Sequence, residues 1–306
     1  MKKSILFSVI FCVSIQCFSQ DSVLASLSEK EILYFFYDAE KKNANDVFRL
    51  NLRQTSLTEV PKGISKYTRL VELNLMKNKI PELSQELFLL QELRILNLRQ
   101  IGINEVPEEF DQLTNLSELR LEKNKLVHLP KEFATLSNLR FLYLSNNKLE
   151  DLPANIGDMK SLQILEADDN RISAIPSSIG QNSALKTLNL AKNQIVELPE
   201  SLFDVSALLD LNLERNKIQT LSPKIKNLKN LKALSLAGNQ LSQVPNELVK
   251  LKDLELLILS QNQLSVLPNK IKKLKQLKTL ILTDNQFSDK EKERILKALP
   301  NTDVRF

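Results

Sequence analysis

A pattern of leucines repeats every 23 residues over most of the chain, and this repeat constrains the fold more than any other feature of the sequence. One copy reads LKTLNLAKNQIVELP over residues 185–199. Eleven copies follow one another without insertion or deletion, and they open at Val47, Leu70, Leu93, Leu116, Leu139, Leu162, Leu185, Leu208, Leu231, Leu254 and Leu277. A fixed period of about 20 to 50 residues is typical of solenoids and other repeat arrays.

Each copy contains a short stretch with the two-residue period of a β-strand. Positions 4 and 6 of the repeat are apolar and flank a variable residue, so they share one face while positions 3, 5 and 7 share the other. We expect the apolar residues at positions 1, 4, 6, 11, 14 and 18 to point into an interior. One coil cannot enclose them, but stacked coils can, and each buried side chain contributes roughly 1.5–3 kcal/mol before the entropic cost.

Two polar columns accompany the leucines. Position 9 is asparagine in nine copies: Asn78, Asn124, Asn147, Asn170, Asn193, Asn216, Asn239, Asn262 and Asn285. Because an amide is both a donor and an acceptor, we predict a ladder in which each asparagine satisfies backbone groups of its own coil and the neighbouring coil. Thr55 and Ile101 interrupt the column, and a local rearrangement is expected at Ile101, which cannot form these bonds. Proline at position 15 of eight copies fixes φ as the chain leaves the turn.

The full pattern, LxxLxLxxNxLxxLPxxIxxLxx over residues 47–287, resembles the repeat of leucine-rich repeat proteins. It is most similar to the 23-residue form of bacterial exported and Ras-scaffold-like members. The resemblance implies an α/β solenoid, a right-handed horseshoe of eleven coils with a parallel β-sheet on its concave face. It also implies a protein partner, bound most often through that sheet.

Residues 1–19 have the composition of a secretory signal peptide. Lys2 and Lys3 precede an apolar run over residues 5–13 that is too short to span a membrane, and small residues precede Gln20. We therefore expect export to the periplasm, the cell surface or the extracellular medium. An ordinary N-terminal core helix is the alternative interpretation.

Both cysteines of the chain lie in this segment, so cleavage would leave a mature protein without a disulfide or a thiol. Neither Cys12 nor Cys17 follows a small residue, and whether one of them carries a lipid stays open. If the segment is retained, a Ras-scaffold-like signalling adaptor inside the cell is the alternative.

Helical caps are expected on both sides of the repeats, over residues 20–46 and 288–306. Each begins with a capping box, formed by Ser28 with Glu31 and by Ser288 with Glu291. The apolar faces that would cover the first and last coils are Ile32, Phe35, Phe36 and Ala39, and Ile295, Leu296 and Leu299.

No catalytic or metal-binding pattern stands out. The one histidine, His128, lies at a variable position, which argues against a serine–histidine–aspartate triad, and the five glycines form no phosphate-binding loop. The acidic run Glu166, Asp168 and Asp169 does not match a calcium loop, and an open sheet offers no pocket for acid–base chemistry. We predict no enzyme activity, no metal and no cofactor.

The variable strand positions are therefore the candidate binding surface. The predicted site on the concave face consists of Ile95, Arg120, Glu122, Phe141, Tyr143, Ile164, Glu166 and Asp168. Apolar and aromatic residues surrounded by charge are typical of interface hot spots, although strand propensity alone would also favour Phe, Tyr and Ile here. A second outward apolar group could be a dimer contact, a second subsite or a flank covered by the C-terminal cap; it contains Ala233, Leu256, Ile258 and Ile281.

Charge is distributed unevenly along the chain, whose net charge is +5. Eleven lysines but only three acidic residues lie within residues 224–278. Most of these lysines occupy the convex and connecting positions of the repeat, where a solvated surface is the simplest interpretation. Weak contact with anionic envelope polymers or lipid headgroups is the alternative, whereas nucleic acid is not expected because no aromatic residues are interleaved.

Overall fold

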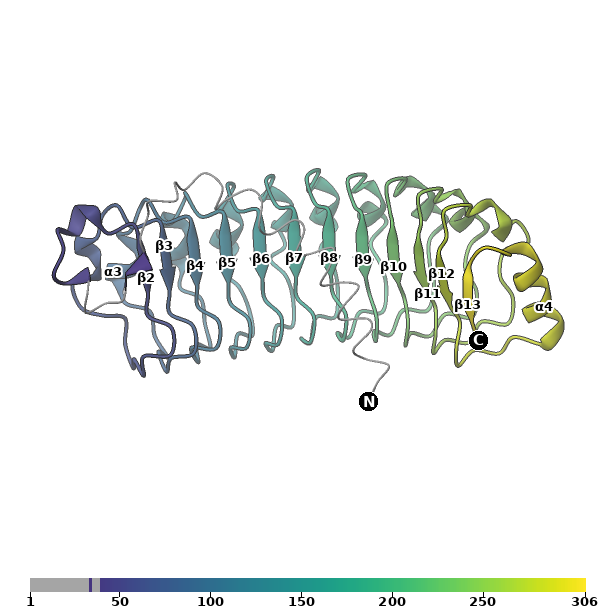
Figure 1. The fold of residues 1–306 in the computed structure, drawn as a ribbon, viewed down its shortest axis with the longest axis horizontal. Helices are drawn as coiled ribbons and strands as arrows, with labels where there is room; N and C mark the ends of the chain where they lie inside the picture. The colour runs from purple at the N-terminus through teal and green to yellow at the C-terminus, as the bar shows by residue number, and fades with distance from the viewer. Residues whose placement is uncertain (1–32, 35–38) are drawn as a thin grey trace.

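The computed structural model describes residues 33–34 and 39–306, which form an open, horseshoe-like solenoid (Figure 1). One sheet of 13 strands follows the order of the chain, and the paired neighbours are parallel. The strands are β1 (Leu33–Tyr34), β2 (Arg49–Asn51), β3 (Glu72–Asn74), β4 (Ile95–Asn97), β5 (Glu118–Arg120), β6 (Phe141–Tyr143), β7 (Ile164–Glu166), β8 (Thr187–Asn189), β9 (Asp210–Asn212), β10 (Ala233–Ser235), β11 (Leu256–Ile258), β12 (Thr279–Ile281) and β13 (Asp303–Arg305).

The predicted register of the repeats is confirmed, because β2 to β12 occupy positions 3 to 5 of the eleven copies. On the side opposite the strand, the coils form helices that are mostly short and 3-10 rather than α-helical. These elements are η2 (Ala44–Asp46), η3 (Ile64–Lys66), α3 (Gln85–Phe88), η4 (Glu108–Gln112), η5 (Lys131–Thr135), η6 (Ile156–Asp158), η7 (Ser177–Gln181), η8 (Glu200–Asp204), η9 (Pro223–Asn227), η10 (Asn246–Lys250), η11 (Ile271–Lys273) and α4 (Asp289–Ala298).

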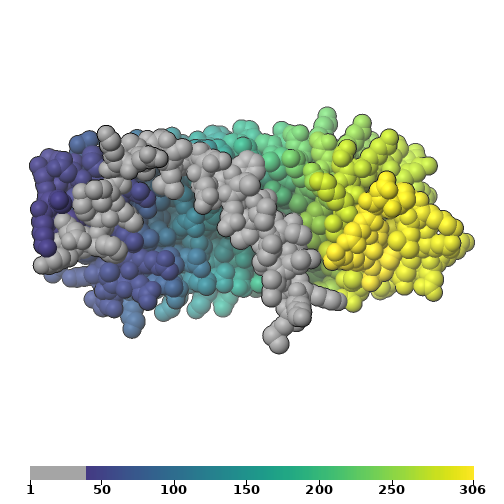
Figure 2. All heavy atoms as spheres, viewed as in Figure 1, coloured from purple at the N-terminus to yellow at the C-terminus, as the bar shows by residue number. Residues whose placement is uncertain are grey.

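The leucines of the repeat form one continuous core along the solenoid. Leu142, Leu165 and Leu188, at position 4 of three successive coils, are fully buried, as their strand period predicts. From β2 to β12, each strand pairs in register with the strand 23 residues later, so equivalent side chains stack in columns. Figure 2 shows the coils packed against one another up to the C-terminal end of the molecule.

The position 9 asparagines join successive coils through hydrogen bonds. In one example, Asn193 Nδ2 donates to the carbonyl oxygens of Ala167 (3.0 Å) and Leu190 (3.0 Å). Its Oδ1 accepts from the backbone N–H of Ile172 (2.9 Å). The other asparagines of the column make equivalent bonds, except that Asn124 Oδ1 accepts from the N–H groups of Ile101 and Gly102. The amides thus satisfy backbone groups that the stacked turns leave unpaired.

The rearrangement at Ile101 has a specific form. The Ile101 carbonyl oxygen accepts the N–H of Ile80 (2.8 Å), which is the bond that an asparagine Oδ1 accepts elsewhere in the ladder. The Ile101 side chain is fully buried, and Gly102 follows with a φ of +100°. A backbone carbonyl thus replaces the side-chain acceptor, and an apolar side chain fills the space.

The residue before the ladder column adopts a left-handed conformation in all eleven coils. At this position φ lies between +54° and +64°, and ten of the residues are not glycine, Lys192 and Gln261 among them. Left-handed backbone costs roughly 1–2 kcal/mol for a non-glycine residue, so the stacking of the coils enforces this turn against local preference.

The N-terminal end differs from the expected helical cap. Leu33 and Tyr34 form β1 and pair with Arg49 and Leu50, so the helix expected across these residues is wrong there. A strand can pair with the backbone N–H and C=O groups on the open edge of β2, which a helix cannot do. Of the predicted helical face, Ala39 is fully buried, while Ile32, Phe35 and Phe36 and the predicted signal peptide lie outside the described residues.

At the C-terminal end, α4 begins after Ser288, whose Oγ accepts the N–H of Glu291 (3.3 Å). The Glu291 carboxylate accepts the backbone N–H of Leu267 (3.0 Å), and Arg294 donates to the Leu267 carbonyl (2.8 Å), which attaches the helix to the preceding coil. Ile295 is buried in the core as expected, but the prediction for Leu296 is wrong, because this side chain is 50% exposed.

Candidate protein-binding face

The sheet carries an apolar cluster on the face opposite the leucine core. Phe141, Tyr143 and Ile164 form this group, which is separate from the continuous core. Phe141 on β6 is in register with Ile164 on β7. Tyr143 is two residues after Phe141 on β6 and therefore faces the same side of the sheet. We call this group the outer cluster.

The outer cluster is less accessible than the sequence predicts. Phe141, Tyr143 and Ile164 are 2%, 4% and 2% exposed. Cationic neighbours contribute to this burial: the guanidinium carbon of Arg120 lies 4.4 Å from the centroid of the Tyr143 ring, and that of Arg140 lies 5.2 Å from the Phe141 ring. An aromatic side chain on β6 also contacts the side chains in register with it on the two neighbouring strands, which reduces its exposure to solvent.

Arg120 connects the outer cluster to the acidic residues around it. Its Nε donates to Glu118 Oε1 at 2.6 Å, and its Nη1 lies 3.9 Å from Glu122 Oε1. Burial disfavours the charged guanidinium, but the carboxylates of Glu118 and Glu122 and the Tyr143 hydroxyl outweigh this effect and raise the Arg120 pKa. The cation is therefore fixed over the Tyr143 ring.

The three predicted acidic residues are Glu166 at the end of β7, and Glu122 and Asp168, which follow β5 and β7. Asp168 Oδ1 accepts hydrogen bonds from Ser145 Oγ and from Asn189 Nδ2 (3.1 Å). Glu122 Oε2 and Glu166 Oε1 are buried and have no hydrogen-bond partner among the described residues. Burial and then the neighbouring Asp168 and Glu122 carboxylates raise the pKa of Glu166 to about 7. Burial also raises the pKa values of Glu122 and Asp168.

The structure does not bring every predicted residue together. Ile95 is nearly buried on β4, but Glu118 on β5 lies between it and Phe141 in the same register column, so Ile95 is not part of the outer cluster. The prediction also omits Glu118, Arg140 and Ser145, which contact predicted residues. Glu118 and Ser145 occupy the same outward columns as the predicted residues, and this signal could have identified them.

The second outward apolar group lies on β10 to β12. Ala233 is in register with Leu256, and Ile258 with Ile281. Ile258 is 5% exposed and the other three are partly exposed. These side chains are separated from the outer cluster by β8 and β9 and form a distinct patch.

Residues considered for chemistry make only ordinary contacts in the described part of the chain. His128 is exposed, and its Nδ1 lies 3.1 Å from Asp151 Oδ2. Across residues 33–34 and 39–306, no group of three histidine, cysteine or acidic side chains is placed to hold a metal ion. Within the same residues, the helices are too short or too polar to cross a membrane.

Two family models match the repeats. A model described as a leucine-rich repeat region matches residues 85–171 and 125–214, and one described as a leucine rich repeat matches residues 229–287. No curated protein sequence matches the chain.

Several solved structures resemble the fold. An internalin (inlF) from Listeria monocytogenes has a TM-score of 0.77 and 26% sequence identity, and the match covers 85% of this chain and 74% of that one. A chain of the octameric complex of Latrophilin 3, Unc5D and the leucine-rich repeats of FLRT2 has a TM-score of 0.66 and 24% identity, covering 82% and 87%. The ectodomain of the Arabidopsis thaliana receptor kinase GASSHO1/SCHENGEN3, in complex with CASPARIAN STRIP INTEGRITY FACTOR 2, has a TM-score of 0.51 and 25% identity, covering 80% and 39%.

Proposed function

Because the chain is a leucine-rich repeat protein, we propose that it is a non-catalytic scaffold that binds a protein partner through the concave face of its sheet. The outer cluster is the observation that carries this proposal. Phe141, Tyr143 and Ile164 lie outside the leucine core, and aromatic anchors with charged neighbours are typical of protein interfaces. Two solved structures of similar fold are complexes with other proteins.

In this proposal the outer cluster is the centre of the contact and the charged residues around it form the rim. Arg120, Glu122, Glu166 and Asp168 border the cluster. Because the rings are almost buried, they support the surface that Arg120 presents. Ile95 lies in the same register column as Phe141, two coils away across Glu118, and extends the apolar contact.

The double substitution Phe141→Ala with Tyr143→Ala tests this proposal. We expect partner affinity to fall by roughly 2 kcal/mol or more, the loss typical of hot-spot residues, while the circular dichroism spectrum is retained. The partner would first be identified by crosslinking in the native cell followed by mass spectrometry, and its affinity would be measured by calorimetry.

The matched control is Leu256→Ala with Ile281→Ala, two partly exposed residues on the same face of the sheet. This variant should bind normally. Unchanged affinity in the folded Phe141/Tyr143 variant would reject the site, and a loss in the control alone would move the contact to β11 and β12.

The location in which the scaffold acts depends on residues 1–19, which lie outside the described residues. Their basic start and apolar run support export. Sequencing the N-terminus of the mature protein decides between the two locations. A start at Gln20 or Asp21 supports export, whereas a retained segment supports the intracellular adaptor.

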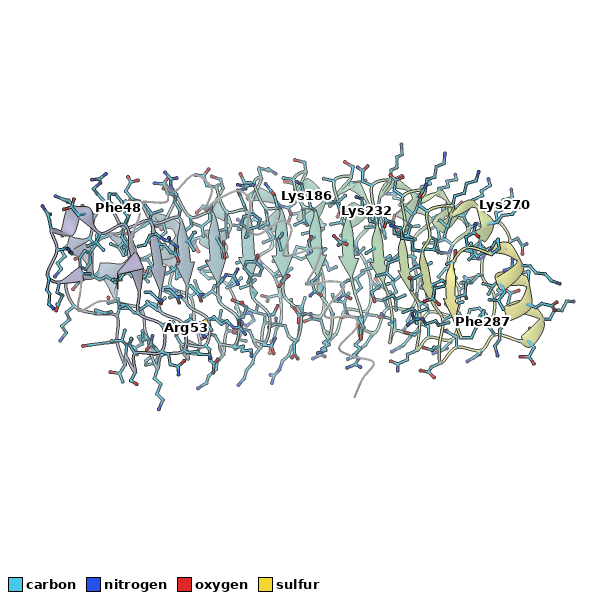
Figure 3. The ribbon with its side chains drawn as sticks, viewed as in Figure 1. Phe48, Arg53, Lys186, Lys232, Lys270 and Phe287 are labelled. Carbon is cyan, nitrogen blue, oxygen red and sulfur yellow. The ribbon has the colours of Figure 1, made fainter. Side chains whose placement is uncertain are left out.

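A second candidate function, adhesion to anionic envelope material, rests on the lysine-rich surface of η9 to η11. All eleven lysines within residues 224–278 are exposed, and two of them, Lys224 and Lys278, form ion pairs with acidic side chains. Lys232 and Lys270 mark the edge on which this surface lies (Figure 3). The equivalent turns η4 and η8 carry acidic residues and no lysine, so the charge changes sign along the solenoid.

The column Lys229, Lys252 and Lys275 tests this second function, because these residues occupy the same position in three successive coils. Changing all three to glutamate should abolish binding to polyphosphate, and binding of the unchanged protein should weaken steeply with salt. The control changes Lys125, Lys148 and Lys217 to glutamate, which alters the net charge equally at a different repeat position. If both variants lose polyphosphate binding equally, net charge alone explains the effect, and the lysine-rich surface is rejected as the binding site.

A further inference from the structure

The outward side chains of β5 to β7 are arranged in two different rows on either side of Tyr143. Phe141 and Ile164, at position 3 of the repeat, form an apolar row. Position 7 of three successive coils holds Glu122, Ser145 and Asp168; we call this the acidic row, in which the serine lies between two carboxylates. Position 3 lies at the start of each strand and position 7 just after its end, so the two rows lie on opposite sides of the central tyrosine at position 5.

Described cations lie near the acidic row, Arg120 and Arg99 near Glu122 and Lys192 near Asp168, but they do not outweigh the burial that raises the pKa of both carboxyl groups. Arg120 is the cation nearest to Glu122, but its shortest ion pair is with Glu118 at 2.6 Å, and its distance to Glu122 is 3.9 Å. Glu122 is only 9% exposed, and its Oε2 has no hydrogen-bond partner among the described residues. Glu166 Oε1 also has no hydrogen-bond partner among the described residues. Glu166 is at position 5 of its coil, in register with Tyr143.

A partner that covers Tyr143 would remove the remaining water from these carboxylates. Burying a carboxylate without a counter-charge is costly, so a neutral or anionic surface would bind poorly there. A lysine or arginine side chain supplies the counter-charge that these carboxylates need. Protonation is the other way to neutralise the site, and the raised pKa of Glu166 shows that its charge is already disfavoured.

We propose that the partner of this face is a basic segment that places a lysine or arginine over the acidic row, between Glu122 and Asp168, and an apolar side chain over Phe141 and Ile164. This inference rests on the proposed function, because it assigns the chemistry of the partner to the same face. It predicts that the interface is selective for the charge of the partner as well as for its apolar side chain.

The experiment selects random peptides displayed on phage against the folded chain and removes those that also bind the Phe141→Ala, Tyr143→Ala variant. We expect the remaining peptides to carry lysine or arginine together with an aliphatic or aromatic residue. The isosteric variants Glu122→Gln and Asp168→Asn should each weaken a selected peptide at least tenfold. Glu197→Gln and Asp204→Asn, exposed acidic residues outside this face, are the matched controls and should leave affinity unchanged.

A charge exchange makes the test specific to the proposed contact. The Asp168→Lys variant should reject the selected peptide and regain affinity for the same peptide with its basic residue replaced by glutamate. Peptides that depend on Phe141 and Tyr143 but lack a basic residue, or that tolerate Glu122→Gln and Asp168→Asn, would overturn this inference and leave the proposed function standing. If no peptide depends on Phe141 and Tyr143, both are overturned.

Discussion

At the scale of the residue, the asparagine column shows how one side chain stabilises stacked turns. Each amide bridges two coils, and the two interruptions keep part of the same pattern with other groups. The Thr55 hydroxyl donates to the Leu52 carbonyl (2.7 Å), as an asparagine would within its own coil, and the Ile101 carbonyl replaces an amide acceptor. The backbone groups of these turns must therefore be hydrogen-bonded, but the group that bonds to them can vary.

Asn193→Ala should destabilise the protein strongly. The substitution leaves the N–H of Ile172 and the carbonyls of Ala167 and Leu190 without their side-chain partner, and we expect the free energy of unfolding to fall by about 3 kcal/mol in urea denaturation. The control is Asn138→Ala, because exposed Asn138 makes one bond, to the Thr114 carbonyl (2.9 Å). Equal effects of the two substitutions would contradict the role of the ladder.

Glu166 should make stability dependent on pH. Its folded pKa of about 7 lies above the ordinary glutamate value of 4.5, so the folded state binds the proton more tightly than the unfolded state. This contribution to stability is complete below about pH 4.5 and is lost as the pH rises through 7. Burial is the main cause of the raised pKa; the Asp168 and Glu122 carboxylates raise it further, and Arg120 opposes them.

The comparison that isolates this group is Glu166→Gln, which resembles the protonated side chain. The variant and the unchanged protein should have similar free energies of unfolding at pH 4, and the variant should be more stable by roughly 2–3 kcal/mol at pH 8. Urea denaturation at a series of pH values measures the difference. A difference that does not change with pH would rule out a raised pKa at this residue.

At the scale of the element, the 3-10 turns approach one another so closely that some positions admit only glycine. A Cβ on Gly180 would lie 2.5 Å from the carbonyl oxygen of Ser201 in the next turn, and a Cβ on Gly157 would lie 2.1 Å from that of Ser178. Both neighbouring atoms are backbone, so the turns would have to separate. Small residues at these two positions thus permit the spacing of η6, η7 and η8.

Gly180→Ala should therefore destabilise the solenoid by roughly 1–3 kcal/mol, because the added methyl group requires backbone displacement between two coils. Thermal unfolding followed by circular dichroism provides the measurement. Gly63→Ala is the comparison, since a Cβ there meets nothing within 4 Å and only the left-handed φ of +75° opposes it. The explanation fails if Gly63→Ala is the more harmful change.

At the scale of the whole molecule, stability is built from contacts between neighbouring coils, and the ends are therefore special. At the N-terminal end β1 covers β2, and at the C-terminal end β13 covers β12, where Leu280 is in register with Val304. Ile295 of helix α4 and Leu299, which directly follows the helix, belong to the core. A strand on each side thus occupies the backbone edge that a helix alone would leave open.

Deleting residues 289–306, which include α4 and β13, should expose the edge of β12 and cause association. We expect the truncated chain to elute as oligomers in size-exclusion chromatography and to unfold at a lower temperature. Leu296→Glu, at a half-exposed position of α4, should remain as soluble as the unchanged chain. A truncated chain with unchanged size and stability would show that this end does not protect the solenoid.

The sequence by itself determined the period, the register, the buried leucines and the position of the asparagine column. It could do so because these features depend on a pattern that every coil repeats, and parallel pairing in register converts each repeat position into a column. The outward residues of β5 to β7 could be identified from the same columns.

Only the tertiary structure decided how those outward residues combine. The stacking of Arg120 on Tyr143 and the separation of Ile95 from the outer cluster depend on side chains from different coils. So do the oxygens of Glu122 and Glu166 that find no hydrogen-bond partner in the described part of the chain. The same holds for β1, because the open edge of β2 favours a strand over the helix that the local pattern suggests. These features arise from contacts between coils, and the pattern within one repeat does not contain them.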